Sequence, residues 1–174
     1  MLEDVVNFNE VPIDDAEFTE KCRLELNQKG VVTLHNFLKY ETVEELIKEA
    51  KTRSRLAYFT DSTHNVYLTP KNENLGPEHV FNRQLSSSKG CITTDQIPEN
   101  SKLKELYFSD IFKNFICRVV EEEALYEYAD SLSSINVHYA SEGQELNWHF
   151  DNSKFAITLL LQAPDSGGNF EYVS

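Results

Sequence analysis

His149 and Asp151 are the two residues of this sequence whose types and spacing suggest a chemical site. They occur in the run Asn-Trp-His-Phe-Asp-Asn, in a segment whose alternating apolar and polar residues predict a β-strand over residues 146–151. Successive side chains of a strand point to opposite faces, so His149 and Asp151 should share one face. An imidazole beside a carboxylate is two thirds of the 2-His-1-carboxylate set that holds non-haem Fe(II). A metal site is therefore one interpretation of this pair.

A purely structural role for the pair is the alternative, and periodicity alone favours it. Polar side chains often hydrogen-bond to each other on the solvent-facing edge of a sheet. The remaining histidines add no obvious ligand, because His35, His64 and His79 have no partner at ligand spacing and are expected at the surface or the edge of the core. His138 precedes Tyr139 on an expected strand, where it either lines the same cavity or packs against the sheet.

Local signals predict two helices and a strand in the front portion of the chain. Apolar residues recur at helical spacing after the Asp14–Asp15 pair, either member of which can cap the helix, and Gly30 is a natural stop. The mostly apolar run at residues 31–38 predicts a strand. Thr42 with Glu45 then forms a capping-box pattern ahead of a second, amphipathic helix.

The rest of the chain changes from helical to strand periodicity. Residues 55–100 contain many turn signals and predict long loops with a few strands. Helical spacing returns at residues 111–120, whose apolar side chains are expected in the core. Further expected strands, the last covered on both faces, are residues 135–139, 146–151 and 155–161. We therefore predict an α+β fold, with N-terminal helices packed on an antiparallel sandwich or barrel.

Composition limits the partners and the location of the protein. Its 174 residues suffice for one domain, and 16 basic against 29 acidic residues give a net charge of −13. This charge argues against nucleic acid or an anionic membrane as a partner. The three cysteines are widely spaced and odd in number, which indicates free thiols in a reducing compartment. No signal peptide or membrane-spanning run is evident, so we expect a cytoplasmic protein.

Residues 139–172 resemble the core of the Fe(II)/2-oxoglutarate-dependent oxygenases. The resemblance rests on Tyr139, Gly143, the His149–Asp151 pair, the apolar run 155–162 and the Gly167-Gly168 turn. The run around His149 and the run Gly-Gly-Asn-Phe-Glu-Tyr-Val are more specifically similar to the branch of hydroxylases and radical halogenases that act on free amino acids such as lysine. This resemblance implies a single domain over residues 1–174. Its helix-rich front portion would be residues 1–132, and residues 133–174 would form the first strands of a double-stranded β-helix, or jelly roll.

The resemblance also implies cofactors and residue roles. His149 and Asp151 correspond to the first two ligands of Fe(II). Tyr139 corresponds to a hydrogen-bond donor for the carboxylate of the cosubstrate 2-oxoglutarate, and Asn152 to a residue that faces the substrate. Halogenases of this branch have a small residue in place of the carboxylate ligand, which frees a coordination position for chloride. Because this chain has Asp151 there, we expect hydroxylation of a small molecule, such as a free amino acid, by molecular oxygen.

Two parts of the family pattern are absent after Asp151. The pattern includes a distal histidine as third ligand and a basic residue, usually arginine, that binds 2-oxoglutarate. After Asp151, the sequence contains no histidine, and Lys154 is its only basic residue. We therefore expect a C-terminally truncated chain with an incomplete roll, whose open sheet edge favours self-association or pairing with a second polypeptide. Two other functions stay open: a non-catalytic binding or regulatory domain of the same fold, and a cupin-like metal-binding protein.

The purified 174-residue chain is expected to produce little or no succinate from 2-oxoglutarate in the presence of Fe(II) and oxygen. The reason is that a histidine and an aspartate hold iron far more weakly than the complete set of three ligands. Succinate measured over time against an enzyme-free blank tests this. Steady production above the blank contradicts it.

Overall fold

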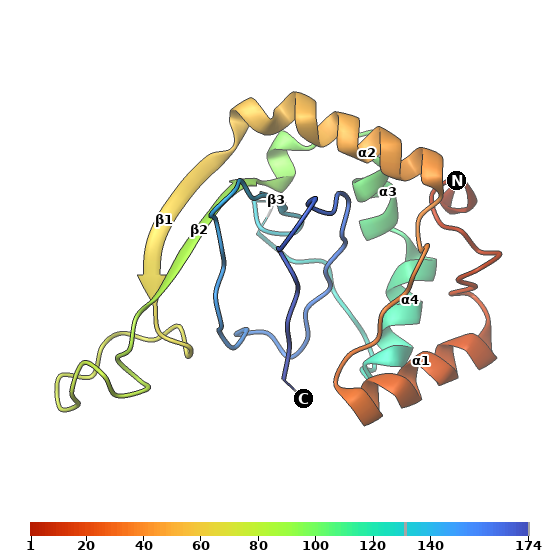
Figure 1. The fold of residues 1–174 in the computed structure, drawn as a ribbon. Coiled ribbons are helices and arrows are strands. Elements are labelled where there is room, and N and C mark those ends of the chain that lie inside the picture. Colours follow the sequence, from red (N-terminus) through yellow and green to blue (C-terminus); the bar gives the residue numbers. More distant parts are fainter. Residues whose placement is uncertain (131, 174) are drawn as a thin grey trace. The chain divides into compact units, whose positions relative to one another are not determined.

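The computed structural model of this chain describes residues 1–130 and 132–173. Over these residues the protein is of mixed α+β type, with four α-helices and one open, antiparallel sheet of three strands (Figure 1). The α-helices are α1 (Ala16–Lys29), α2 (Tyr40–Arg53), α3 (Lys102–Tyr107) and α4 (Asp110–Val119). The strands are β1 (Tyr58–His64), β2 (Leu85–Ile92) and β3 (Val137–Tyr139). Short 3-10 helices are η1 (Leu2–Asp4), η2 (Ser54–Leu56) and η3 (Thr94–Gln96).

The chain divides into two compact units. The first contains the four α-helices and is formed by residues 1–52, 93–135 and 161–174. The second contains the sheet and is formed by residues 53–92 and 136–160. His149 and Asp151 belong to the second unit.

Helix α1 begins and ends where the sequence signals predict. Asp15 is the N-cap, and its Oδ1 accepts a hydrogen bond from the Phe18 N–H at 2.7 Å. Gly30 follows the last helical residue with φ of 73°, a left-handed conformation that glycine adopts without a steric penalty. Its N–H donates to the Leu26 carbonyl at 2.7 Å. Of the two aspartates that the sequence offers, Asp15 is therefore the cap.

The apolar side chains of α4 form part of the core of the first unit, as predicted. Phe115 and Val119 are buried, and the Phe115 ring stacks on Phe18 of α1 with ring centroids 6.3 Å apart. The Ser109 side chain caps α4 by accepting from the Phe112 N–H. The same core contains buried residues from the N-terminal segment and α2, which are Val5, Val6, Val11, Ile13 and Leu46.

The predicted strand at residues 31–38 is wrong. This segment is irregular and makes an isolated bridge between Leu38 and Val6. Asn36 has φ of 55°, which interrupts the extended backbone that a strand requires. The neighbouring N-terminal segment is in turn mostly turn and 3-10 helix, so it offers no long strand partner.

The capping box predicted at Thr42 is also wrong, although the amphipathic helix behind it is confirmed. Helix α2 begins two residues earlier, at Tyr40, so Thr42 lies inside the helix. Its hydroxyl donates to the Asp4 carbonyl at 3.1 Å and thereby ties α2 to the N-terminal segment. Leu46 is buried, and Val43 packs against the same core.

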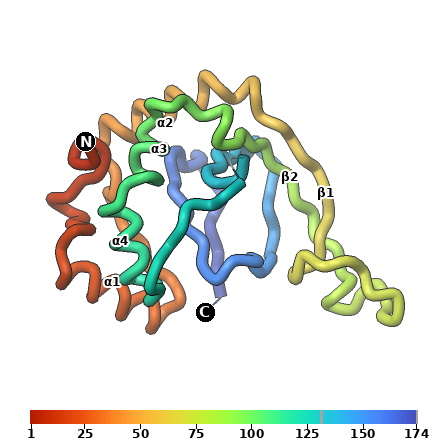
Figure 2. Tube along the Cα trace, turned by 180° about the vertical axis from the view of Figure 1, so that it is seen from behind, coloured from red at the N-terminus to blue at the C-terminus, as the bar shows by residue number. Residues whose placement is uncertain are grey.

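The sheet of the second unit has the order β1-β2-β3, with β2 in the middle. The β1–β2 register runs from Tyr58 opposite Cys91 to His64 opposite Leu85, and the loop 65–84 joins the two strands (Figure 2). Strand β3 pairs with the end of β2, placing Tyr139 opposite Gly90. The Phe59 ring lies over Gly90, where an added Cβ would be 2.7 Å from a ring carbon. A side chain at that position would displace the ring.

Two further predicted strands, at residues 146–151 and 155–161, are wrong. Both segments are irregular, and within the described chain the sheet ends at β3. Asn147 has φ of 57°, which breaks the extended backbone of the first segment. The second is not covered on both faces, since Leu160 is 75 % exposed. A strand forms where a neighbouring strand takes its backbone hydrogen bonds, and no described strand does so here. The α+β class is confirmed, and no jelly roll is assigned over the described residues.

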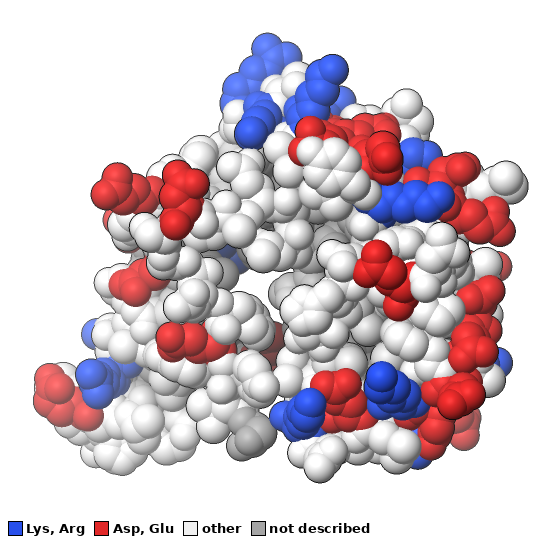
Figure 3. All heavy atoms as spheres, turned by 45° about the vertical axis from the view of Figure 1, so that its right-hand side comes forward, with Lys and Arg blue, Asp and Glu red and all other residues white. Residues whose placement is uncertain are grey.

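Acidic side chains are spread over the face of the protein shown in Figure 3, in keeping with the excess of 29 acidic over 16 basic residues. Some basic side chains form ion pairs, such as Arg23 with Glu20 and Glu121.

Among the helices in the described ranges, none is both long and apolar enough to cross a membrane.

Replacing Asp15 by alanine is expected to lower the free energy of unfolding by about 1 kcal/mol, because the Phe18 N–H loses its acceptor. The neighbouring Asp14→Ala variant is the matched control. Urea unfolding followed by circular dichroism measures both. Equal destabilisation by the two variants would contradict the assignment of Asp15 as the cap.

Candidate functional site

His149 and Asp151 lie side by side in the second unit. The distance from His149 Nε2 to Asp151 Oδ1 is 3.4 Å, and 30 % and 55 % of the two side chains are exposed. His149 Nδ1 lies 3.0 Å from the Asn147 carbonyl oxygen. A carbonyl oxygen only accepts hydrogen bonds, so Nδ1 is the nitrogen that carries the proton in this contact. The Nε2 atom is therefore the one directed toward the carboxylate.

This arrangement suits a cation or a proton between the two side chains. In the neutral imidazole, Nε2 then has a lone pair that faces a carboxylate oxygen, and two acceptors need a positive group between them. Metal-binding histidines commonly donate their other ring N–H to a backbone carbonyl, as His149 does to Asn147. Imidazole with carboxylate is also a donor set that suits iron. The chemistry of the two residues therefore fits a metal ion.

The alternative occupant of the gap is a proton. An imidazolium at His149 would form an ion pair with Asp151 at the same 3.4 Å distance. Over residues 1–130 and 132–173, no group of three or more histidine, cysteine, aspartate or glutamate residues is placed to hold a metal. Among the described residues, a metal at this place would therefore have two side-chain ligands, His149 and Asp151.

The pair does not lie on a strand, and the turn after β1 positions it instead. His64 Nε2 lies 3.1 Å from the Leu146 carbonyl oxygen, and the His64 ring meets the His149 ring edge-on, with centroids 5.6 Å apart. The Phe150 N–H donates to the Val66 carbonyl at 2.8 Å. Sequence reasoning missed these residues, because His64 and Leu146 are 82 positions apart and no spacing rule connects them.

A fully satisfied asparagine holds this turn in place. Asn65 is 1 % exposed, and its side-chain amide donates to the carbonyls of Thr69 and Phe81 at 2.9 and 2.5 Å. Its Oδ1 accepts from the N–H groups of Tyr67 and Thr69 at 3.0 and 3.1 Å. Buried polar atoms are costly when unpaired, so these four bonds restrict residues 65–69 to one conformation.

The other two predicted site residues are Tyr139 and Asn152. Tyr139 is the last residue of β3 and is half-buried, opposite Gly90 in the sheet. Asn152 is exposed and directly follows Asp151. Their roles toward 2-oxoglutarate and a substrate stay predictions.

His138, whose role the sequence left open, lies in the sheet beside Lys89. Its Nε2 is 3.5 Å from the Lys89 ammonium, and its backbone is opposite Cys91. Neighbouring protein atoms displace part of the water around the ring, and this lowers the pKa of His138. The charge of Lys89 lowers the pKa further. Both effects favour the neutral form of His138.

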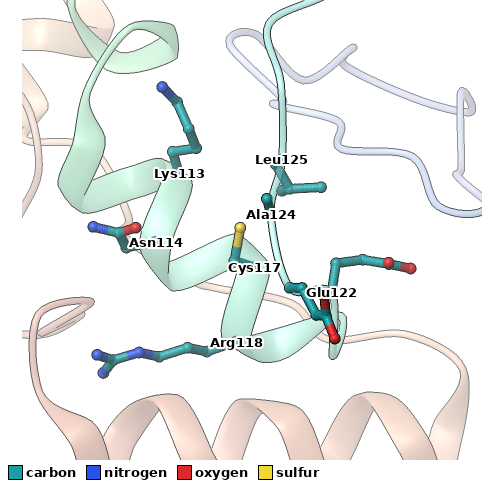
Figure 4. Close-up of a pocket in the computed structure, with 8 residues that line it drawn as sticks. Lys113, Asn114, Cys117, Arg118, Glu122, Ala124 and Leu125 are labelled. Atoms are coloured by element: carbon teal, nitrogen blue, oxygen red, sulfur yellow. The ribbon is translucent and has the colours of Figure 1, made fainter.

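A pocket of about 380 Å³ lies in the first unit, between α4 and the segment that follows it (Figure 4). Figure 4 shows the Cys117 thiol directed from α4 toward the side where Ala124 and Leu125 pass. The lining residues are Lys113, Asn114, Cys117, Arg118, Glu122, Glu123, Ala124 and Leu125. None of the predicted site residues is among them.

Comparison with known proteins gives one match. A sequence model of the protein family described as halogenase D matches residues 13–174. This range contains all four α-helices, the sheet and the His149–Asp151 pair. No curated protein and no solved structure matches the chain.

The free energy of unfolding is expected to fall as the pH drops from about 7.5 to 5.5, in part because of His138. Its pKa is lower in the folded than in the unfolded chain, so below about pH 6.5 the unfolded chain binds more protons. A His138→Gln variant should lose less stability over the same range. Urea unfolding of both proteins at several pH values measures the difference. Parallel pH profiles would contradict the lowered pKa.

Proposed function

This chain belongs to the halogenase D family, and on that premise we propose that its site binds non-haem Fe(II) through His149 and Asp151. The reaction we propose is the hydroxylation of a small molecule, such as a free amino acid, with 2-oxoglutarate and molecular oxygen as cosubstrates. The single observation that carries the proposal is the convergence of His149 Nε2 and Asp151 Oδ1, 3.4 Å apart, while His149 Nδ1 contacts a backbone carbonyl.

The residues of this chain would have distinct tasks in that reaction. When bound, iron with 2-oxoglutarate supplies the power to oxidise a C–H bond. His149 would bind the metal through Nε2, with its ring orientation fixed by the Asn147 carbonyl, and Asp151 would supply a negative charge. Tyr139 would donate a hydrogen bond to a carboxylate of 2-oxoglutarate. Asn152, exposed beside Asp151, would contact a polar group of the substrate.

Asp151 favours hydroxylation over halogenation within this family. Radical halogenases of the amino-acid branch have a small residue at the carboxylate position, so chloride takes the vacated coordination site. In this chain the position carries a carboxylate whose oxygen is directed at His149 Nε2. An Asp151 carboxylate on the metal would leave no such vacancy for chloride.

The fold, the location and the assembly are proposed along the same lines. The antiparallel pairing of β1, β2 and β3 supports a single oxygenase domain with the start of a jelly roll. Free Cys22, Cys91 and Cys117 support a cytoplasmic location. Strands β1 and β3 form the two edges of the sheet, which supports self-association through an edge.

A non-catalytic binding domain is the second candidate. The observation that favours it is that the described residues place two, not three, metal-binding side chains together. In that case His149 and Asp151 would form an imidazolium–carboxylate ion pair that fixes the segment in place. A chelator would then leave the stability of the protein unchanged.

An anaerobic titration with Fe(II) and 2-oxoglutarate tests the proposed function. We expect a visible charge-transfer absorption band from the chelated keto acid, because this cosubstrate binds the metal through two oxygens. Asp151→Ala should abolish the band by removing a ligand, and it should also remove any rise in melting temperature on ligand binding. The matched control is Asp165→Ala, which replaces an exposed aspartate of the first unit.

Two results would overturn the proposal. One is the absence of a band in the parent protein up to millimolar Fe(II). The other is a band of unchanged strength in Asp151→Ala. A melting temperature that is insensitive to Fe(II) and to chelator in the parent protein would favour the binding domain instead.

A further inference from the structure

We infer that His64, the last residue of β1, and Tyr67, in the loop that follows it, are positioning residues for the His149–Asp151 pair. The role toward a metal rests on the proposed function, whereas the contacts themselves do not. Neither residue follows from the family pattern in the sequence, since both lie far from the pair along the chain.

The contacts of this turn are found on both sides of His149. Before it, His64 Nε2 lies 3.1 Å from the Leu146 carbonyl oxygen. At His149 itself, the two imidazole rings meet at an angle of 80°. After it, the Tyr67 ring stacks on Phe150 with centroids 5.5 Å apart and an interplanar angle of 19°. Phe150 is the residue between the two proposed ligands, so holding its backbone and ring also restricts the backbone from which the His149 and Asp151 side chains project.

The stacked rings continue away from the pair into the loop 65–84. Tyr67 also stacks on Phe81, with centroids 4.7 Å apart, and Phe81 stacks on His79, with centroids 5.5 Å apart. Phe150 is thus the last of four rings in contact, although 64 % of it is exposed. Offset stacking of this kind contributes beyond the burial of apolar area. The stack therefore gives the exposed, irregular segment around Phe150 a partner in the loop 65–84.

The rigidity of the turn is what allows it to position another segment. Asn65 lies between His64 and Tyr67 and is held by four hydrogen bonds to backbone groups. A second buried asparagine, Asn82, bonds in the same way to backbone groups of Asn72, Leu75 and Gly76. The loop 65–84 is therefore an ordered structure held by its own polar network.

His64 positions the pair without being a ligand. Its Nδ1 lies 3.0 Å from the Asn65 carbonyl oxygen and its Nε2 lies 3.1 Å from the Leu146 carbonyl oxygen. Both ring nitrogens therefore lie against backbone carbonyl oxygens, so neither is directed at a site shared with His149. The ring edge instead limits the rotation of the His149 imidazole, whose Nδ1 is held by Asn147 on another side.

Hydrogen exchange of peptides covering residues 146–151, combined with the anaerobic Fe(II) and 2-oxoglutarate titration, tests the inference. Tyr67→Ala removes the stacking, and His64→Phe keeps a ring but removes the N–H donor. Each should raise exchange in residues 146–151 roughly two- to tenfold and leave α1–α4 unchanged. Each should also weaken Fe(II) binding. Tyr67→Phe retains the aromatic ring, and His64→Gln retains an N–H donor. In both variants, residues 146–151 should exchange more slowly than in Tyr67→Ala and His64→Phe.

Matched controls and separate readouts make the outcomes distinct. Tyr58→Ala removes an exposed tyrosine at the far end of β1 and should leave residues 146–151 unchanged. The inference is overturned if neither Tyr67→Ala nor His64→Phe alters exchange there, if exchange rises over the whole sheet, or if the parent segment already exchanges as an unstructured peptide. An iron band in the parent that neither variant weakens overturns the inference and leaves the proposed function standing. Local exchange effects without any band in the parent support the positioning contacts and reject the metal.

Discussion

The side-chain amide of Asn65 is the constraint on which the candidate site depends. Removing this residue from water is tolerable because four backbone groups satisfy it, and an unpaired buried group would cost about 1–3 kcal/mol. The same bonds fix the backbone on either side of Val66, whose carbonyl accepts from Phe150. A polar network in one loop thereby determines where His149 is held, although His149 itself lies in an irregular segment.

The two units of the chain are stabilised in different ways. The helical unit has a continuous apolar core that includes Val5, Val6 and Leu46, each almost completely buried. The unit with the sheet has few buried apolar residues, and Asn65 and Asn82 are prominent among its buried side chains. Its stability therefore depends on hydrogen bonds and stacked rings, which are directional. Directional contacts of this kind hold side chains in defined orientations.

The His149–Asp151 pair lies within the part of the chain that matches the family. The match to the halogenase D family covers nearly the whole chain. The proposal of hydroxylation rests on the Asp151 carboxylate, one oxygen of which lies 3.4 Å from His149 Nε2. The same pair is also compatible with an ion pair, so the presence of a metal, rather than the geometry of the two side chains, separates an oxygenase from a binding domain.

What the sequence determined by itself was local. The caps of α1 and the apolar face of α4 follow from residues at most four positions apart, where helix geometry acts directly. Tertiary structure decided which segments pair. The expected strands at 31–38 and 155–161 are apolar runs, and 146–151 alternates apolar and polar residues. A strand forms only with a partner, however, and left-handed residues interrupt the first and the second of the three segments, 31–38 and 146–151. The contact of His64 with Leu146 likewise depends on the closure of a long loop, which no local pattern encodes.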